Sequence, residues 1–163
     1  MDYNELLNHL QVVGKDPSRL IFEDELTGLY NRRFLYNYFQ QNIPWNALED
    51  NPLSLLMMDV DYFKRINDSY GHDVGDQALI WVANLLREAS GDKYLPIRYA
   101  GDEFMILMPL SRKKTAVSLA EKVISLSHVK PMRLDDSGKP LDLTLSIGVA
   151  CAPEDAQGDK ALI

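Results

Sequence analysis

The sequence contains little cysteine and no long apolar run. Its single cysteine, Cys151, excludes an internal disulfide, and the apolar residues 147–152 around it favour a buried thiol over a nucleophile. No stretch approaches the roughly 18 apolar residues of a membrane-spanning helix. Residues 1–13 lack the basic flank and the unbroken apolar run of a signal peptide. We therefore expect a cytoplasmic chain without a membrane span.

Positive charge is also scarce. The 17 Lys and Arg are outnumbered by 24 Asp and Glu, which gives a net charge of −7. Because nucleic-acid binding depends on clustered basic side chains that neutralise phosphates, this balance argues against a nucleic-acid partner. It does not exclude a nucleotide substrate, because a metal ion can bring positive charge to the phosphates.

The overall composition is ordinary for a globular protein. Apolar residues make up 46 % and charged residues 25 %, and 163 residues fit one domain with a single core. Apolar residues at helical spacing between positions 6 and 13 predict a short N-terminal helix. Such a helix either transmits a signal, pairs with a copy of itself or packs back on its own domain. We assign residues 1–22 to this helix and a linker, and residues 23–163 to the main domain.

Apolar segments predict the strands of a central sheet. The almost continuously apolar run at 53–58 indicates a buried strand, and residues 94–99 and 103–108 have the pattern of a β-hairpin. Residues 130–134 are expected to pair with residues 141–149 through the turn between them.

Helical spacing of apolar residues predicts the elements that cover this sheet. Helices are expected after Asn31, a suitable N-cap, over residues 63–70, and in a longer stretch after Gly71. A last helix should be capped by Ser111. Its buried side is predicted to comprise Val117, Leu119, Ala120, Val123, Ile124 and Leu126. The order indicates an α+β fold close to a ferredoxin-like core, an antiparallel-rich central sheet flanked by helices, with the helices expected on one face.

Acidic residues stand where two predicted strands end. Asp59 follows the central strand, and Asp102 and Glu103 lie at the hairpin tip, after the turn Ala100-Gly101 that lets a ligand approach the backbone. If the two strands are neighbours, these carboxylates lie side by side and offer the oxygen ligands that Mg²⁺ prefers. Taken singly, each acid is also compatible with a solvated turn or strand end.

Longer motifs connect these residues. Residues 24–33 read D-E-L-T-G-L-Y-N-R-R, residues 59–76 match D-x-D-x-F-K-x-x-N-D-x-x-G-H-x-x-G-D throughout, and residues 98–104 read R-Y-A-G-D-E-F. With residues 143–150, they resemble the GGDEF family of diguanylate cyclases, with Ala100 in place of the first Gly of the signature loop. The resemblance covers most of the chain and implies the palm-like fold of nucleotidyl cyclases.

The resemblance implies an enzyme that condenses two GTP into cyclic di-GMP and pyrophosphate. Its cofactor would be Mg²⁺ or Mn²⁺, held by Asp59, the Val60 carbonyl, Asp102 and Glu103, with Asp102 also deprotonating the attacking 3′-hydroxyl. The implied substrate-binding residues are Phe63, Lys64, Asn67, His72, Asp76 and Gly101, of which Asn67 and Asp76 take the positions that read guanine. Because each domain would hold one GTP, catalysis requires a homodimer.

The sequence also departs from the family pattern. Ala100 strains the turn only if its φ is positive. Residues 91–94, G-D-K-Y, stand where the family has its R-x-x-D feedback-inhibition motif. The family's final helix is not reached, so we interpret the chain as a fragment of a protein with further domains. The alternative is a degenerate module that binds GTP and regulates a neighbouring domain without catalysis. A cyclase with an adenine-containing product is disfavoured by Asp76.

Overall fold

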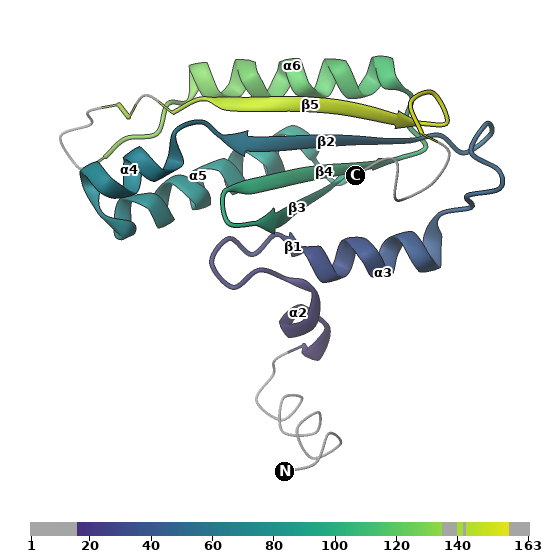
Figure 1. Ribbon diagram of the computed structural model, residues 1–163, viewed down its shortest axis with the longest axis horizontal. Coiled ribbons are helices and arrows are strands. Elements are labelled where there is room, and N and C mark those ends of the chain that lie inside the picture. The colour runs from purple at the N-terminus through teal and green to yellow at the C-terminus, as the bar shows by residue number, and fades with distance from the viewer. Residues whose placement is uncertain (1–15, 135–139, 142, 157–163) are drawn as a thin grey trace, which may run out of the picture.

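The computed structural model describes residues 16–134, 140–141 and 143–156, and its centre is a five-stranded sheet (Figure 1). The strands are β1 (Tyr30–Asn31), β2 (Leu53–Val60), β3 (Leu95–Ala100), β4 (Glu103–Pro109) and β5 (Leu145–Ala152). Their order across the sheet is β1-β3-β4-β2-β5, with β1 parallel to β3 and the other neighbouring pairs antiparallel. The predicted central strand and hairpin are confirmed, and β2 and β4 are neighbours.

Helices flank this sheet. They are α2 (Pro17–Phe22), α3 (Arg32–Asn42), α4 (Phe63–Tyr70), α5 (His72–Ser90) and α6 (Lys113–Val129). The predicted N-cap of α3 is confirmed, because the Asn31 Oδ1 accepts a hydrogen bond from the Phe34 N–H at 3.1 Å. None of the helices in the described part of the chain is long and apolar enough to cross a membrane. The predicted helix near residues 6–13 lies outside the described residues.

Both faces of the sheet are covered by helices. On one face, side chains such as Met58 and Phe104 pack in a core with α5 and α6. On the other face, Leu55 and Met105 pack in a second core with Leu35 of α3. The expectation of helices on one face is therefore wrong. The physical reason lies in β2 and β4, which are apolar at successive positions and so bury side chains on both sides.

The last helix differs from its prediction at its start and on its outer face. Arg112, not Ser111, is the N-cap of α6. The Ser111 side chain is buried, and its hydroxyl donates to the Pro109 carbonyl at 3.2 Å. Val117 and Ile124 are each 41 % exposed instead of buried. The apolar pattern of this segment is wider than the stripe that contacts the sheet.

Strand β5 also has a different partner from the one predicted. It pairs along its whole length with β2, so both edges of β2 are occupied. Within the described residues, the expected pairing of 130–134 with 141–149 is reduced to one bridge between Arg133 and Pro140 and one hydrogen bond from the Leu141 N–H to the Met132 carbonyl. The turn at 135–139 lies outside the described residues.

Candidate active site

The acidic residues predicted to form a site meet where β2 and β4 end. The register places Asp59 opposite Glu103, and the Val60 N–H donates to the Asp102 carbonyl at 3.3 Å. Burial, and then the negative charges of Asp102, Glu103 and Asp61, raise the pKa of the Asp59 carboxyl. In the part of the chain that the structure describes, no Lys or Arg forms an ion pair with Asp59, Asp102 or Glu103.

This acidic cluster suits a divalent cation that is also bound by a ligand. Within the described ranges, no group of three or more His, Cys, Asp or Glu side chains lies in a metal-holding arrangement. Mg²⁺, however, is commonly held by one or two carboxylates together with substrate phosphates and waters. Asp59 and Asp102 supply such a pair, and the negative charge of Asp102 at Asp59 favours a cation nearby. The donor set therefore fits Mg²⁺ or Mn²⁺.

The hairpin tip accepts alanine without strain. Among the described residues, Tyr62 and Leu110 are the only non-glycine residues with a positive φ, so Ala100 is outside the left-handed region. Gly101 takes the positive φ of the turn, at 40°. The sheet register shifts between Arg98 and Ala100, and Ala100 is exposed. The substitution of the first signature glycine is thus conformationally harmless.

An arginine ties this tip to the segment before β1. The Arg98 Nε and Nη2 donate to the Gly101 carbonyl at 2.9 and 2.8 Å, and its Nη1 donates to the Asp24 carboxylate at 3.0 Å. Asp24 also accepts from the Thr27 N–H and hydroxyl at 2.9 and 2.7 Å. Burial alone would raise the pKa of Asp24, but the hydrogen bonds from Thr27 and Arg98 lower it overall. This role of Asp24 and Arg98 was not foreseen from the sequence.

The same segment is held against α5 at a glycine. Gly28 has a φ of 64°, and a Cβ at this position would lie 3.0 Å from the Arg87 Nη2. That guanidinium donates to the Thr27 carbonyl. A side chain at position 28 would therefore require both a strained backbone and displacement of Arg87.

The predicted nucleotide-contacting residues lie along the junction of α4 and α5. Gly71, with a φ of 87°, turns the chain between the two helices. A Cβ on Gly75 would lie 1.9 Å from the Asn67 Oδ1, so glycine is needed for the Asn67 side chain to occupy this junction. Lys64, His72 and Asp76 are exposed, and Asn67 and Phe63 are half-buried. The junction thus presents polar groups beside the end of β2.

The family is decided by comparison with known proteins. The family model described as "Diguanylate cyclase, GGDEF domain" matches residues 21–163. The chain belongs to the GGDEF family.

This GGDEF domain is similar in sequence to part of several longer bacterial proteins. It is 36 % identical over 146 residues to the response regulator PleD of Caulobacter vibrioides, covering 88 % of this chain and 32 % of PleD. It is 39 % identical over 127 residues to the diguanylate cyclase DgcM of Escherichia coli, covering 78 % of this chain and 30 % of DgcM. It is also 36 % identical over 160 residues to the cyclic di-GMP phosphodiesterase NbdA of Pseudomonas aeruginosa, covering 98 % of this chain and 20 % of NbdA. The chain thus spans between a fifth and a third of these relatives.

Solved structures agree with the fold. The GGDEF domain of TpbB (YfiN) from Pseudomonas aeruginosa superposes with a TM-score of 0.75 at 34 % identity, covering 86 % of this chain and 81 % of that one. The coiled coil and GGDEF domain of DgcB from Caulobacter crescentus, solved with c-di-GMP, gives a TM-score of 0.75 at 24 % identity. It covers 94 % of this chain and 80 % of that one, and supports the fold alone.

The second carboxylate of the D-x-D segment at 59–61 has partners that the sequence did not predict. Asp61 accepts hydrogen bonds from the Thr144 hydroxyl at 2.5 Å and the Ser146 hydroxyl at 2.6 Å. Hydrogen bonding from Ser146 and then Thr144 lowers the pKa of Asp61. The available signal was the match of both segments to family motifs, which gave no hint that they meet.

Proposed function

We propose that this GGDEF domain is a diguanylate cyclase that condenses two GTP into cyclic di-GMP and releases two pyrophosphates, one from each GTP. The observation that carries the proposal is the acidic pair Asp59 and Asp102, at the ends of neighbouring strands and without an ion-pair partner among the described residues. Acidic side chains that gather closely enough to raise the pKa of one of them, here Asp59, are typical of a functional site.

The acidic residues would hold the metal and handle the proton. Asp59, Asp102, Glu103 and the Val60 carbonyl would bind Mg²⁺ or Mn²⁺, which, when bound, reduces the negative charge that repels the nucleophile from the α-phosphate. Asp102 accepts the proton of the attacking 3′-hydroxyl. At the tip, Gly101 has no side chain and lets the phosphates approach the backbone.

The α4–α5 junction would bind the rest of GTP. Lys64 and the backbone of Phe63 contact the phosphates, and His72 lies near the nucleotide. Asn67 and Asp76 read the base, because a carboxylate accepts from the ring N–H and the exocyclic amine of guanine, a donor pair that adenine lacks. Support for this assignment comes from Gly75, which leaves room for the Asn67 side chain between the helices.

The reaction would need two copies of the domain. One domain holds one GTP, so each 3′-hydroxyl must reach the α-phosphate of a GTP on a facing domain, which makes a two-fold homodimer a mechanistic requirement. We place the domain in the cytoplasm, where GTP is available. Further domains belong to this proposal because the relatives are three to five times as long as the matched part. We assign residues 23–163 to the cyclase domain and 1–22 to its linker.

The test is synthesis of cyclic di-GMP by the full-length protein. Purified protein is incubated with GTP and Mg²⁺, and nucleotides are separated by liquid chromatography. We expect cyclic di-GMP and pyrophosphate from GTP, and no cyclic product from ATP. The name of the relative NbdA, a phosphodiesterase, favours a second candidate, a domain that binds GTP and regulates a neighbouring domain without catalysis. Calorimetric binding of GTP without any product would support that alternative.

We further propose that the product does not inhibit the domain at the family's usual secondary site. That site needs an Arg and an Asp, whereas Gly91 and Tyr94 occupy the two positions. Tyr94 is buried, and its hydroxyl accepts a hydrogen bond from the Ser111 hydroxyl at 3.5 Å, so it offers no carboxylate to a base. Progress curves with and without micromolar cyclic di-GMP should coincide. Strong non-competitive inhibition would contradict this prediction.

A further inference from the structure

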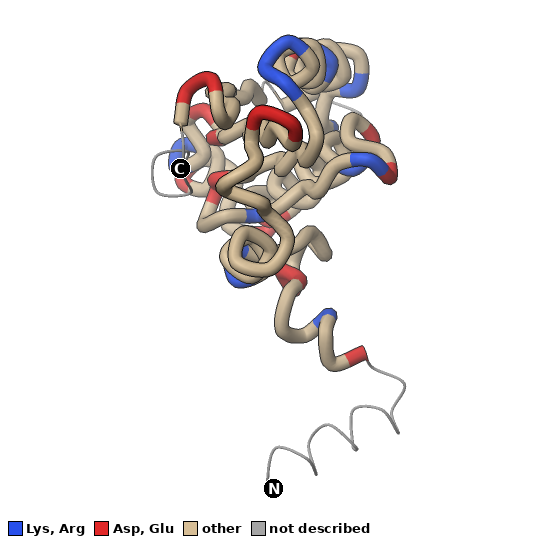
Figure 2. Tube along the Cα trace, turned by 90° about the vertical axis from the view of Figure 1, so that its right-hand side faces the viewer, with Lys and Arg blue, Asp and Glu red and all other residues tan. Residues whose placement is uncertain are grey.

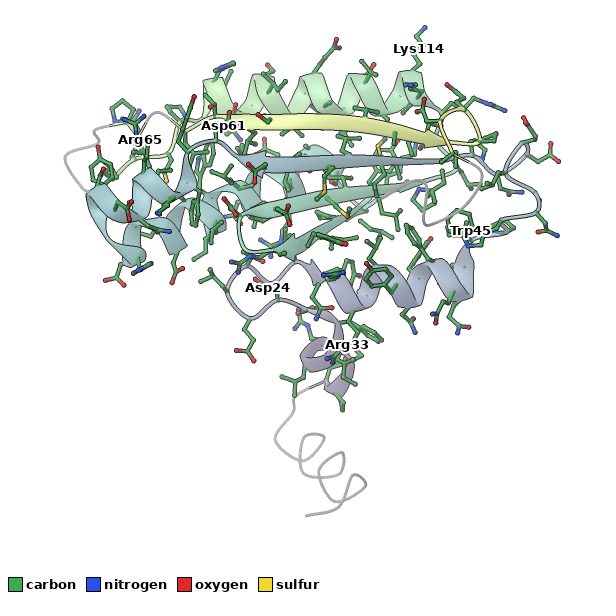
Figure 3. All side chains as sticks on the ribbon, in the orientation of Figure 1. Asp24, Arg33, Trp45, Asp61, Arg65 and Lys114 are labelled. Atoms are coloured by element: carbon green, nitrogen blue, oxygen red, sulfur yellow. The ribbon has the colours of Figure 1, made fainter. Side chains whose placement is uncertain are left out.

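Asp61 connects two strands at the point where the chain leaves the sheet. Its two carboxylate oxygens each accept one hydroxyl, Oδ2 from Thr144 at 2.5 Å and Oδ1 from Ser146 at 2.6 Å. Its own N–H donates to the Thr144 carbonyl at 3.0 Å. Figure 3 shows Asp61 beside the start of β5. Three hydrogen bonds therefore fix one residue directly after the last residue of β2.

The residues on both sides of Asp61 belong to the candidate active site. Val60, whose carbonyl is a proposed metal ligand, ends β2 directly before it, and Asp59 lies opposite Ser146 in the β2–β5 register. On the other side, α4 begins at Phe63 and carries the proposed phosphate- and base-contacting residues. A small movement of Asp61 would thus move the metal ligands and the nucleotide-binding helix relative to each other.

The next residue shows that this turn is imposed on the chain. Tyr62 has a φ of 57°, a left-handed conformation that costs a non-glycine residue about 1 kcal/mol or more. Its side chain is 74 % exposed, so burial of the ring does not hold the backbone there. Hydrogen bonds hold the chain on both sides of this position. Those of Asp61 lie before it, and the Arg65 and Ile66 N–H groups donate to the Tyr62 carbonyl at 2.8 and 3.4 Å after it.

We propose that Asp61, Thr144 and Ser146 form a clamp that positions the Val60 carbonyl and the start of α4 for catalysis. The inference rests on the proposed cyclase function and assigns positioning residues to it. Asp61 acts through position, since its carboxylate is held by Thr144, the residue directly before β5, and by Ser146 of β5. In the strand order β4-β2-β5, β5 lies on the side of β2 away from Asp102.

Mutating the two hydroxyl residues tests the clamp without changing an acidic residue. Thr144→Val and Ser146→Ala each remove one donor, and the double variant removes both. Because misplacement of reacting groups by about 1 Å costs about 100-fold in rate, we expect the double variant to lose about 10- to 100-fold in kcat. Its melting temperature should fall by about 2–4 °C, the shift that about 1 kcal/mol causes in a chain of this size, which leaves the domain folded in the assay. Thr144→Ser, unlike Thr144→Val, keeps the hydroxyl and should therefore retain most of the wild-type activity.

Combining the variants shows whether Asp61 and the two hydroxyls affect kcat through one shared interaction or independently. Asp61→Ala should lower kcat as much as the hydroxyl double variant, and the triple variant should be no worse than either, because all remove the same interaction. Thr115→Val and Ser118→Ala, which remove exposed hydroxyls from α6, are the matched controls and should leave kcat unchanged. Loss of activity in Asp61→Asn with full activity in the hydroxyl double variant would overturn the clamp and indicate a direct role for Asp61.

A second readout does not depend on the reaction. Amide hydrogen exchange over residues 60–66 should be faster in the hydroxyl double variant than in the wild type or the α6 controls. If the wild type makes no cyclic di-GMP, the cyclase proposal fails, and this exchange still tests whether the clamp fixes the turn. Unchanged exchange over these residues would overturn the clamp even if the wild type is active.

Discussion

The two ends of the sheet differ in whether their acidic side chains form ion pairs. At the hairpin-tip end, Asp59, Asp102 and Glu103 lie together with no ion pair to a described Lys or Arg. At the opposite end, where α6 begins, basic and acidic segments lie next to each other (Figure 2). There the Lys113 Nζ pairs with the Asp155 Oδ1 at 2.6 Å.

The pKa directions show the same contrast. Hydrogen bonding and attraction to Lys113 lower the pKa of Asp155, whereas burial and neighbouring acids raise that of Asp59. The acids of the tip end repel one another, and a bound cation would relieve that repulsion. Asp24 and Arg98 lie beside this end but are paired with each other, and Arg98 also holds the Gly101 carbonyl of the tip.

The largest expected effect is on the unpaired acids. Asp102→Asn removes a proposed metal ligand and base from a half-exposed turn while keeping its shape. We expect cyclic di-GMP synthesis to fall by about 10³-fold or more, with a melting temperature at or above that of the wild type because repulsion is relieved. Near-normal turnover in a GTP assay would remove Asp102 from the mechanism.

A smaller effect is expected from the paired residues next to them. Arg98→Ala removes the donors of the Gly101 carbonyl and one of the donors of the Asp24 carboxylate, which keeps those from Thr27. This loss should lower the free energy of unfolding by about 1–3 kcal/mol. Arg98→Lys is the control, because it keeps the charge but not the forked geometry and should recover only part of the loss. Chemical denaturation measures both variants. If Arg98→Ala has the same free energy of unfolding as the wild type, the hydrogen bonds of Arg98 do not stabilise the tip.

The dependence of stability on pH should have opposite signs at the two kinds of carboxylate. The pKa of Asp24 is lowered by folding, so its contribution is complete above the ordinary value of 3.8 and is lost as the pH falls through the folded value. The pKa of Asp59 is raised, so its contribution is complete below 3.8 and is lost as the pH rises through the folded value. Without metal and at neutral pH, Asp24→Asn should therefore be less stable than the wild type, and Asp59→Asn more stable. Both differences should shrink toward pH 3 in denaturation curves.

The smallest effect is expected at the opposite end of the sheet. Lys113→Ala breaks an exposed ion pair, and such pairs contribute little in water. We expect the melting temperature to change by about 2 °C or less, with cyclase activity unchanged. A large loss of activity would mean that this end also takes part in function.

The sequence predicted the helices and strands better than it predicted which of them pack or pair together. Continuous apolar runs identified β2 and the hairpin, and the Asn31 cap set the start of α3, because these signals are local. The partner of β5 and the cover on both faces depend on which apolar surfaces meet in space, and periodicity does not encode that choice. Val117 and Ile124 were misassigned for the same reason.

For the candidate site, too, the sequence predicted some contacts and missed others. Asp59 and Asp102 were predicted to meet, and the register of β2 and β4 brings their segments together. The hydrogen bonds of Asp61 and Arg98 were missed, because each joins segments about 75 to 85 residues apart through side chains whose role is positional. Motif matches located these residues without giving their partners.

The most direct test of the central claim is whether the unpaired acids bind a metal–nucleotide complex. A non-hydrolysable GTP analogue is titrated calorimetrically into the full-length protein with Mg²⁺, with EDTA, and into Asp59→Asn with Mg²⁺. We predict that binding with Mg²⁺ weakens by about tenfold or more both on chelation and in the variant, while Lys113→Ala binds like the wild type. Equal affinity in all of these titrations would contradict the assignment of the tip-end acids to a metal–nucleotide site.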